Sequence, residues 1–249
     1  MDDADTTTDL ARDRLDSVFE DTRGRERARR TAPEMFAAVD RFWHAATSNP
    51  KLSPRMQELV LLALHAASSA LNGPAIERHV ARAISAGASE TDVLDVLVTI
   101  IPLANHPLYV GIPLLLEELK ETGQVDEASV PPMTSEASAV KDDFITSRGY
   151  WTPLRDLIGQ LLPDYFSTFI GACMEPWRSG SLLAKERELI YIAIDCSITH
   201  TYEPGMRMHV RNALRYGATR DEILAVFQLA ALLGTEGYVL GASALAVAK

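Results

Sequence analysis

The chain has 249 residues, 47% of them hydrophobic, and a net charge of −10 at pH 7. Such a chain can bury a full core without disulfides, and its acidic balance argues against a phosphate-binding face and so against nucleic acid as a partner. Its two cysteines follow no disulfide or metal motif, its first residues are acidic rather than signal-like, and no uninterrupted apolar run reaches the roughly 18 residues of a membrane span. We therefore expect a soluble cytoplasmic protein without a membrane partner.

The composition changes along the chain and predicts five segments. Residues 1–32 are highly charged, with a weakly amphipathic stretch from Leu10 to Phe19 and a basic run from Arg23 to Arg30, and are expected to form a solvated arm or helix. Two helical units are expected over residues 33–120 and 163–249. Between them, residues 121–139 are rich in Ser, Pro and acidic residues, which indicates a linker, whereas the aromatic segment 140–162 is too apolar for a linker and should pack on the second half.

The two helical units are copies of one another. A constant shift of 130 aligns residues 33–119 with residues 163–249 without a gap. Only two ionisable residues are among the identities that define the repeat: Glu58 matches Glu188, and His79 matches His209. The glutamate precedes the histidine by 21 residues in each copy, so any account of function must explain these pairs.

Helix signals recur at matching positions in both copies. Apolar runs over residues 58–70 and 188–198 indicate helices buried on all sides, and further apolar helices are expected over 90–104 and 220–233. The start and stop signals are Ser53-Pro54, Gly73-Pro74, Glu203-Pro204, Gly87, Gly217 and the capping boxes Ser89-x-x-Asp92 and Thr219-x-x-Glu222. No segment alternates with period two, so we predict an all-α protein with about five helices in each half.

The order of these features resembles that of the carboxymuconolactone decarboxylase family, which shares its fold with the alkylhydroperoxidase D-like proteins. The strongest match runs from Glu188-Leu-Ile through His209 to Gly217-Ala-Thr-Arg-Asp-Glu-Ile223. The resemblance implies two helical repeats packed as a fused dimer. It also implies a homo-oligomer, either a trimer of two-repeat chains or a dimer.

The cysteine positions distinguish two branches of this fold. The peroxidase relatives place a Cys-x-x-Cys pair just ahead of the histidine, where a thiolate attacks the peroxide and a second thiol resolves it. Neither residues 72–78 nor residues 202–208 contain a cysteine, and Cys196 and Cys173 have no resolving partner nearby in the sequence. Thiol peroxidase activity is therefore disfavoured.

The decarboxylase branch implies loss of carbon dioxide from a small organic acid or lactone without a metal or organic cofactor. Such chemistry requires a group that moves a proton and a group that holds a carboxylate. His209 and His79 are candidates for the proton transfer, and Glu188 and Glu58 for orienting each imidazole and keeping it charged. A structural hydrogen bond inherited by both copies would explain the pairs equally well.

The residues that differ between the copies favour the second half as the working one. Its helix break carries His200, Tyr202 and Glu203, where the first copy has Ala70, Asn72 and Gly73. The first half in turn contributes His106, whose counterpart is Glu236. All of these are candidate site residues, and a pocket between the halves could draw on both sets.

Three questions stay open at this stage. His200, Glu203 and His209 are considered as metal ligands, but their spacing matches no known motif and no metal is predicted. Arg78, Arg207 and Arg211 are expected at the surface or an interface, which leaves the carboxylate-binding group unidentified. A ligand-binding or scaffold protein without catalysis, or a divergent isomerase or hydrolase, remains the alternative to a lyase.

Overall fold

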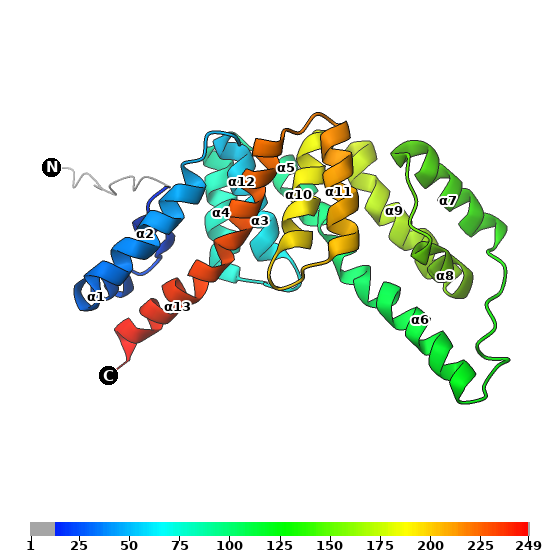
Figure 1. Ribbon diagram of the computed structural model, residues 1–249. Helices are drawn as coiled ribbons and strands as arrows, with labels where there is room; N and C mark the ends of the chain where they lie inside the picture. The colour runs from blue at the N-terminus through cyan, green and yellow to red at the C-terminus, as the bar shows by residue number, and fades with distance from the viewer. Residues whose placement is uncertain (1–12, 249) are drawn as a thin grey trace.

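The computed structural model describes residues 13–248 and consists of helices, turns and loops (Figure 1). Predictions that concern residues 1–12 lie outside this range. The elements are η1 (Leu15–Val18), α1 (Thr22–Thr31), α2 (Pro33–Thr47), α3 (Pro54–Ala66), α4 (Gly73–Ser85), α5 (Glu90–Thr99), η2 (Ile101–Asn105), α6 (His106–Glu121), α7 (Ser135–Arg148), α8 (Leu154–Leu161), α9 (Pro163–Ser179), α10 (Ala184–Cys196), α11 (Glu203–Arg215), α12 (Arg220–Ala231) and α13 (Leu233–Val247). The described residues contain no strand, so the all-α prediction is confirmed.

Each half contains the five helices that the sequence predicts, α2–α6 and α9–α13. The capping boxes at Ser89 and Thr219 are both formed, and Gly87 and Gly217 have φ values of 94° and 87°, in the left-handed region that glycine favours. The helix expected over residues 90–104 ends at Thr99 and continues as η2, which contains Pro102. Proline lacks the backbone N–H that a continuing helix would need.

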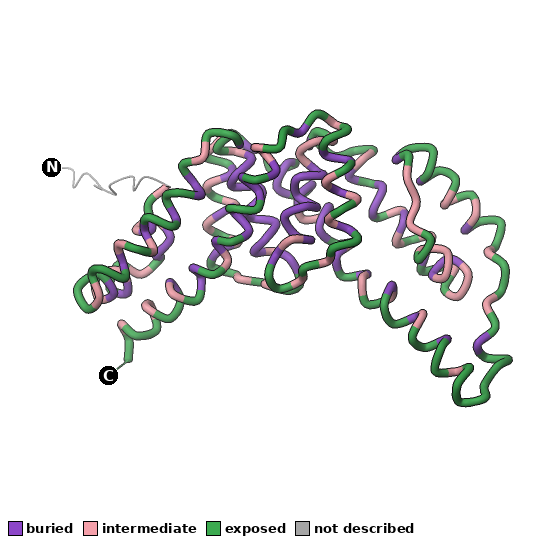
Figure 2. The backbone as a smooth tube through the Cα atoms, in the orientation of Figure 1, coloured by how far each residue is buried: buried purple, intermediate pink, exposed green. Residues whose placement is uncertain are grey.

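The core lies where the two halves meet. Helices α3 and α10 pack against each other in the middle of the molecule and are the most extensively buried elements (Figure 2). This burial on all sides confirms the interpretation of the two apolar runs. It also places Glu58 and Glu188, near the N-terminal ends of these helices, inside the protein.

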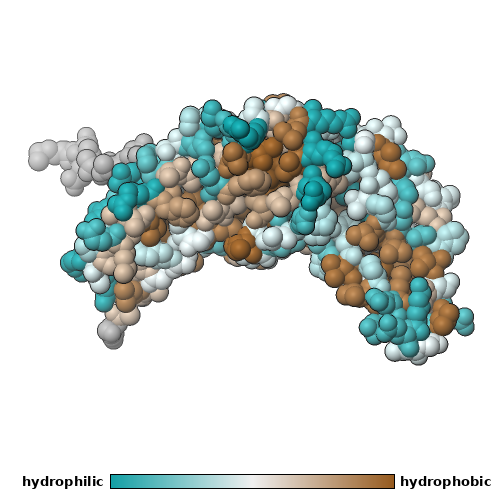
Figure 3. All heavy atoms as spheres, in the orientation of Figure 1, coloured by the Kyte–Doolittle hydropathy of each residue, from teal (hydrophilic) through white to brown (hydrophobic). Residues whose placement is uncertain are grey.

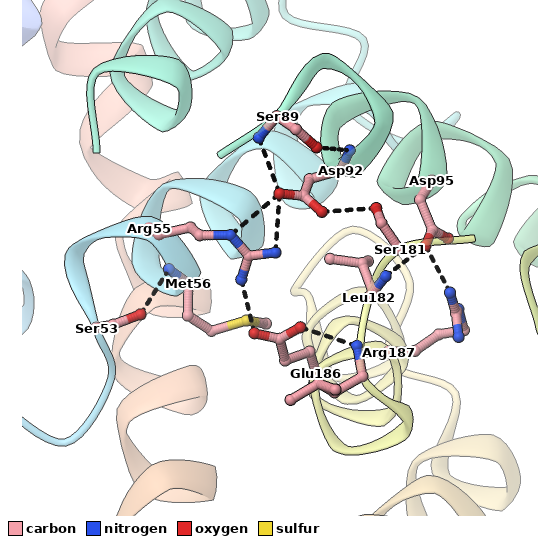
Figure 4. Close-up of polar contacts among 11 residues, drawn as sticks. Ser53, Arg55, Met56, Ser89, Asp92, Asp95, Ser181, Leu182, Glu186 and Arg187 are labelled. Atoms are coloured by element: carbon pink, nitrogen blue, oxygen red, sulfur yellow. Dashed lines mark hydrogen bonds and ion pairs between the residues drawn. The ribbon is translucent and has the colours of Figure 1, made fainter. Parts of the chain in front are cut away.

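Two ion-pair networks join the halves beside this core (Figure 4). Arg55, at the start of α3, donates to Asp92 at 3.2 Å and to Glu186 of the second half at 2.7 Å. Arg187 of α10 is 2% exposed and donates to Asp95 of α5 at 2.6 Å. Because a buried charge is costly without its partner, these contacts fix how the halves are placed relative to one another.

The last helix of each half reaches across to the first segment of the other half. Helix α6 packs on α8, and α13 packs on α1, which gives the molecule two arms that diverge from the central bundle (Figure 1). Under the shift of 130, α1 corresponds to residues 152–161, which include α8. The repeat therefore begins before Pro33, and residues from both halves meet in each arm.

Parts of the N-terminal segment and of the linker differ from expectation. Leu15 and Val18 are fully buried in the main core, because η1 and α1 cover the first half, so this segment is not a solvated arm. The predicted linker ends early, since Thr134 caps α7 through its side chain and the helix begins at Ser135. Phe144 of the aromatic segment is buried in a second cluster with residues of α6, α8 and α9.

Two helical stretches of the described chain, Glu90–Glu121 and Arg220–Val247, have the length and composition of a membrane span. Core helices of soluble proteins meet the same criteria, and 44% and 50% of the two windows are buried in the fold. These stretches are therefore weak evidence for a membrane protein. Exposed hydrophobic side chains nevertheless occur along both arms and over α12 (Figure 3).

Candidate active site

A cavity of about 80 Å³ lies in the second half, at the base of one arm. Its walls come from α9, α10, α11, the segment from α7 to α8, and η2 with the start of α6. The polar residues that line it are His106, Tyr109, Arg148, Tyr150, Thr152, Arg155, Tyr191, Asp195, Tyr202 and His209. The convergence of ionisable groups on one cavity is typical of a binding or catalytic site.

His209 is held in this cavity by Glu188. The imidazole Nδ1 lies 2.6 Å from Glu188 Oε2, and the ring of Tyr191 stacks on the imidazole at 4.4 Å. The other carboxylate oxygen of Glu188 accepts a hydrogen bond of 2.7 Å from Arg148. The glutamate and histidine that the repeat singled out are therefore in direct contact, and Nε2 is the imidazole nitrogen left for chemistry.

The equivalent pair in the first half is closed off. His79 Nδ1 lies 2.8 Å from Glu58 Oε2, but the His79 side chain is 0% exposed. Burial, together with the nearby charges of Arg78 and Arg82, lowers the pKa of His79 well below its usual value. The expectation that Glu58 keeps His79 charged is therefore wrong, and these two residues are part of the core.

The structure brings together three further predicted residues from separate elements. His106 Nδ1, at the start of α6, lies 2.7 Å from His200 Nε2, and the Tyr202 ring lies 4.0 Å from the His106 ring. Burial lowers the pKa of His106 to about 4, with the charges of His200, His209 and Arg155 acting in the same direction. Burial also lowers the pKa of His200. His106 and Tyr202 line the cavity, and His200 lies beside them.

Glu203 does not reach the cavity. It is the first residue of α11, it is 67% exposed, and it pairs with Arg207 one helical turn away on the outer surface. The trio of His200, Glu203 and His209 that the sequence offered as a metal site is therefore not assembled. Its geometry fails because Glu203 and His209 lie on different faces of the helix.

The arginines are placed differently from expectation. Arg207 and Arg211 are exposed, as predicted, but the Arg78 side chain is only 8% exposed. It donates to Glu236 at 2.6 Å. These two residues line the first-half counterpart of the cavity, which measures about 120 Å³ but is not lined by His79. The arginines that do line the cavity, Arg148 and Arg155, come from the aromatic segment and were missed.

Arg155 is the candidate carboxylate-binding group. Its Nε donates to the Tyr109 hydroxyl at 3.1 Å, while its Nη1 is buried and makes no hydrogen bond within the described part of the chain. A permanently charged guanidinium with an unused donor matches the planar geometry of a carboxylate. A signal was present in the sequence, because Arg25 and Arg155 are identical under the shift of 130, just outside the aligned window.

Asp195, which differs from its counterpart His65 but was not among the candidate site residues, also lines the cavity. Its carboxylate lies 3.9 Å from His209 Nε2 and 3.8 Å from His200 Nε2. Burial raises the pKa of Asp195 to about 7, with the charge of Glu188 adding to the effect and that of His209 opposing it. Gly205 makes room for this carboxylate, since a Cβ atom there would collide with Asp195 and lie 2.7 Å from the Tyr202 ring.

The cysteines do not support thiol chemistry. Cys173 lines the cavity, but burial raises the pKa of its thiol to about 12, and burial does the same to Cys196. A peroxide-reducing cysteine needs the opposite shift, toward a thiolate at neutral pH. The cavity therefore offers histidine, carboxylate and arginine groups rather than a reactive thiolate.

An all-α protein of two similar helical units, with a buried glutamate–histidine pair in each unit, is the class that this fold and site define. The family model described as the carboxymuconolactone decarboxylase family matches residues 33–108 and 162–249. The chain belongs to this family. The two matched segments correspond to the two repeats.

A solved structure agrees with this assignment. The chain is similar to a crystal structure from Burkholderia xenovorans titled a "putative gamma-carboxymuconolactone decarboxylase subunit", with 34% sequence identity and a TM-score of 0.85. The match covers 94% of each chain, so it includes the arms as well as the repeats. A search of curated proteins gives no match.

Proposed function

We propose that this protein is a lyase that releases carbon dioxide from a small organic acid or lactone by acid–base chemistry in the second-half cavity. The observation that carries the proposal is the position of His209. Its Nδ1 is bound by Glu188, and it shares one small cavity with Arg155, whose buried Nη1 makes no hydrogen bond to any of residues 13–248. The family match and the similar crystal structure support the same reaction class.

The residues have distinct tasks in this proposal. Arg155 binds a carboxylate or lactone oxygen of the substrate through its free N–H, and Tyr109 holds the guanidinium in place. When the bond to the leaving carboxylate breaks, carbon dioxide departs and the electron pair remains on carbon as an enolate. His209 delivers a proton from Nε2 to that carbon, and solvent then restores the proton.

Glu188 acts through His209 and not on the substrate. Its carboxylate accepts from Nδ1 and so determines which imidazole nitrogen faces the cavity. Arg148 holds the other oxygen of the same carboxylate at 2.7 Å. Because both oxygens are bound, the imidazole has one orientation, which proton delivery to a fixed carbon atom requires.

The test is a panel of lactone acids and β-keto acids, assayed for release of carbon dioxide by the purified protein. We expect His209→Gln to lower kcat by about 100-fold or more, the usual contribution of a positioned acid or base. Arg155→Met should raise KM by at least tenfold, a loss of about 1.4 kcal/mol in binding.

The matched control is His79→Gln, which changes the equivalent, fully buried histidine of the first half. Turnover by this variant should stay within about twofold of wild type under conditions where circular dichroism shows it to be folded. Equal loss of turnover in both histidine variants would contradict the assignment of the site to the second half. Tight binding of an acid without any turnover would instead identify a ligand-binding protein.

A further inference from the structure

The cluster of His106, His200 and Asp195 is not explained by the proton transfer described above. These side chains come from the start of α6, the turn after α10 and the last turn of α10. One ligand atom from each, the imidazole nitrogens and a carboxylate oxygen, lies within 4.8 Å of the others. Two of them border the cavity directly.

The ligand atoms of the cluster are near one another, at distances on either side of those around a zinc ion. His106 Nδ1 lies 2.7 Å from His200 Nε2, which in turn lies 3.8 Å from Asp195 Oδ1. Ligand atoms that bind one zinc ion at about 2.0–2.2 Å are about 3.3–3.6 Å apart in a tetrahedral site. Binding would therefore replace the hydrogen bond between the imidazoles, move their nitrogens apart by roughly 0.6 Å and bring Asp195 closer to His200.

The charge of Asp195 is not balanced in the way that comparable buried carboxylates are. Its Oδ2 is buried and makes no hydrogen bond, and no Lys or Arg of residues 13–248 forms an ion pair with it. A buried carboxylate without a partner is costly. Asp95, by contrast, has Arg187 at 2.6 Å.

The first half holds a related cluster with a different composition. There His65 and His79 approach Glu236, and Arg78 supplies a cation to Glu236 at 2.6 Å. Under the shift of 130 these residues correspond to Asp195, His209, His106 and Met208, whereas His200 replaces Ala70. The second half therefore adds a histidine to this region and has a neutral residue in place of the arginine.

We propose that His106, His200 and Asp195 form a binding site for a divalent transition metal ion, of which Zn²⁺ fits best. Two imidazole nitrogens and one carboxylate oxygen are a ligand set that zinc uses in catalytic sites, where the fourth position holds water or substrate. His106 and Asp195 line the same cavity as His209 and Arg155, so an ion held by them would be accessible from that cavity.

Only the role given to the ion in catalysis rests on the proposed function. An ion at this site would hold an oxygen of the bound acid and stabilise the negative charge that develops when carbon dioxide leaves. The metal-binding site itself is argued from the geometry and charge of the cluster alone. It departs from the metal-free chemistry that the family resemblance implied.

The experiment measures metal binding without reference to turnover. Protein without a histidine tag is stripped with a chelator and titrated with Zn²⁺ by calorimetry and with Co²⁺ by visible absorption. We expect one ion per chain with a Kd below about 1 μM and the d–d bands of a four-coordinate cobalt site. His106→Gln and His200→Gln should each weaken binding at least tenfold.

The control is His44→Gln, because His44 is an exposed histidine far from the cluster in sequence and should leave the affinity unchanged. If either cluster variant fails to fold, Asp195→Asn takes its place, with the same expected loss. Binding of equal affinity in wild type and the cluster variants, or no binding by wild type, would overturn the proposal.

The two proposals fail separately. Undiminished turnover by the stripped protein, together with absent zinc binding, would refute the metal site and leave the lyase in place. One tightly bound ion that depends on His106 and His200, together with no turnover of any acid, would support the metal site and refute the lyase. Both results are obtained from the same preparations.

Discussion

Arg148 offers the sharpest test of how the site is held together. Its guanidinium donates to Glu188 at 2.7 Å and lies 3.2 Å from the centre of the Trp177 ring. The side chains of Arg148 and Glu188 are 3% and 0% exposed, so neither charge is solvated. The substitution Arg148→Met keeps most of the side-chain volume and removes the charge, which leaves the carboxylate of Glu188 with His209 as its remaining strong partner.

The expected cost follows from this burial. Removing one partner of a buried ion pair usually destabilises a protein by about 3–5 kcal/mol. Because His209 stays in contact with Glu188, we expect a value near the lower end, about 3 kcal/mol. The double variant Arg148→Met/Glu188→Gln removes both charges and should recover about 1–2 kcal/mol of that loss.

Urea unfolding followed by tryptophan fluorescence and circular dichroism measures these differences. The matched control is Arg178→Met, because Arg178 forms an exposed pair with Asp143 and should contribute less than about 1 kcal/mol. A loss below about 1 kcal/mol for Arg148→Met, or strictly additive losses in the double variant, would refute the reasoning. If Arg148→Met alone does not fold, folding of the double variant still reports the coupling.

Three further predictions concern the rest of the molecule. Burial lowers the pKa of His65 to about 3, so as the pH falls below about 6.5 this histidine is protonated in the unfolded chain but not in the folded protein. Between pH 7 and 5, wild type should therefore lose about 2 kcal/mol more stability than His65→Gln. Equal losses in urea titrations of the two proteins would count against this. Gly180→Ala should destabilise the protein by about 1–3 kcal/mol, because a Cβ atom there would collide with Asp95 and Pro176. Gly171→Ala, where a Cβ atom would lie in open space within α9, should stabilise the protein by up to about 1 kcal/mol. Shifts of the melting temperature with the same sign in both variants would contradict this. Burial raises the pKa of both cysteine thiols to about 12, so a thiol reagent at pH 7 should label them only after unfolding, and rapid labelling of the native protein would be incompatible with that environment.

Local signals in the sequence were sufficient for the helices. Capping boxes, prolines in first helical turns and glycines after helix ends act over a few residues, and the structure forms them at Ser89, Thr219, Gly87 and Gly217. The same locality explains an error, since the apolar pattern over residues 90–104 does not reveal that α5 stops at Thr99. Hydrophobic periodicity continues through a 3₁₀ turn that changes the direction of the chain.

The candidate site was only partly predictable. The repeat identified Glu188 and His209, because duplication makes two residues stand out against a diverged background, and their contact at 2.6 Å follows from the packing of α10 on α11. Nothing in residue spacing distinguished exposed Glu203 from buried Asp195. Which face of a helix meets a cavity depends on neighbouring helices that lie far away in the chain.

The sequence by itself determined the all-α class, the duplication, the family and the glutamate–histidine pair, because each of these is recorded in local patterns or in matching positions. Only the tertiary structure decided which histidine faces a cavity. Helix α6 crosses to the other half and places His106 and Tyr109 beside Arg155, in a cavity lined by His209. In the first copy α13 brings Glu236 to Arg78, and the cavity beside this pair is not lined by His79. Contacts between segments distant along the chain carry no local signature, since they arise from how the hydrophobic faces of the helices pack together.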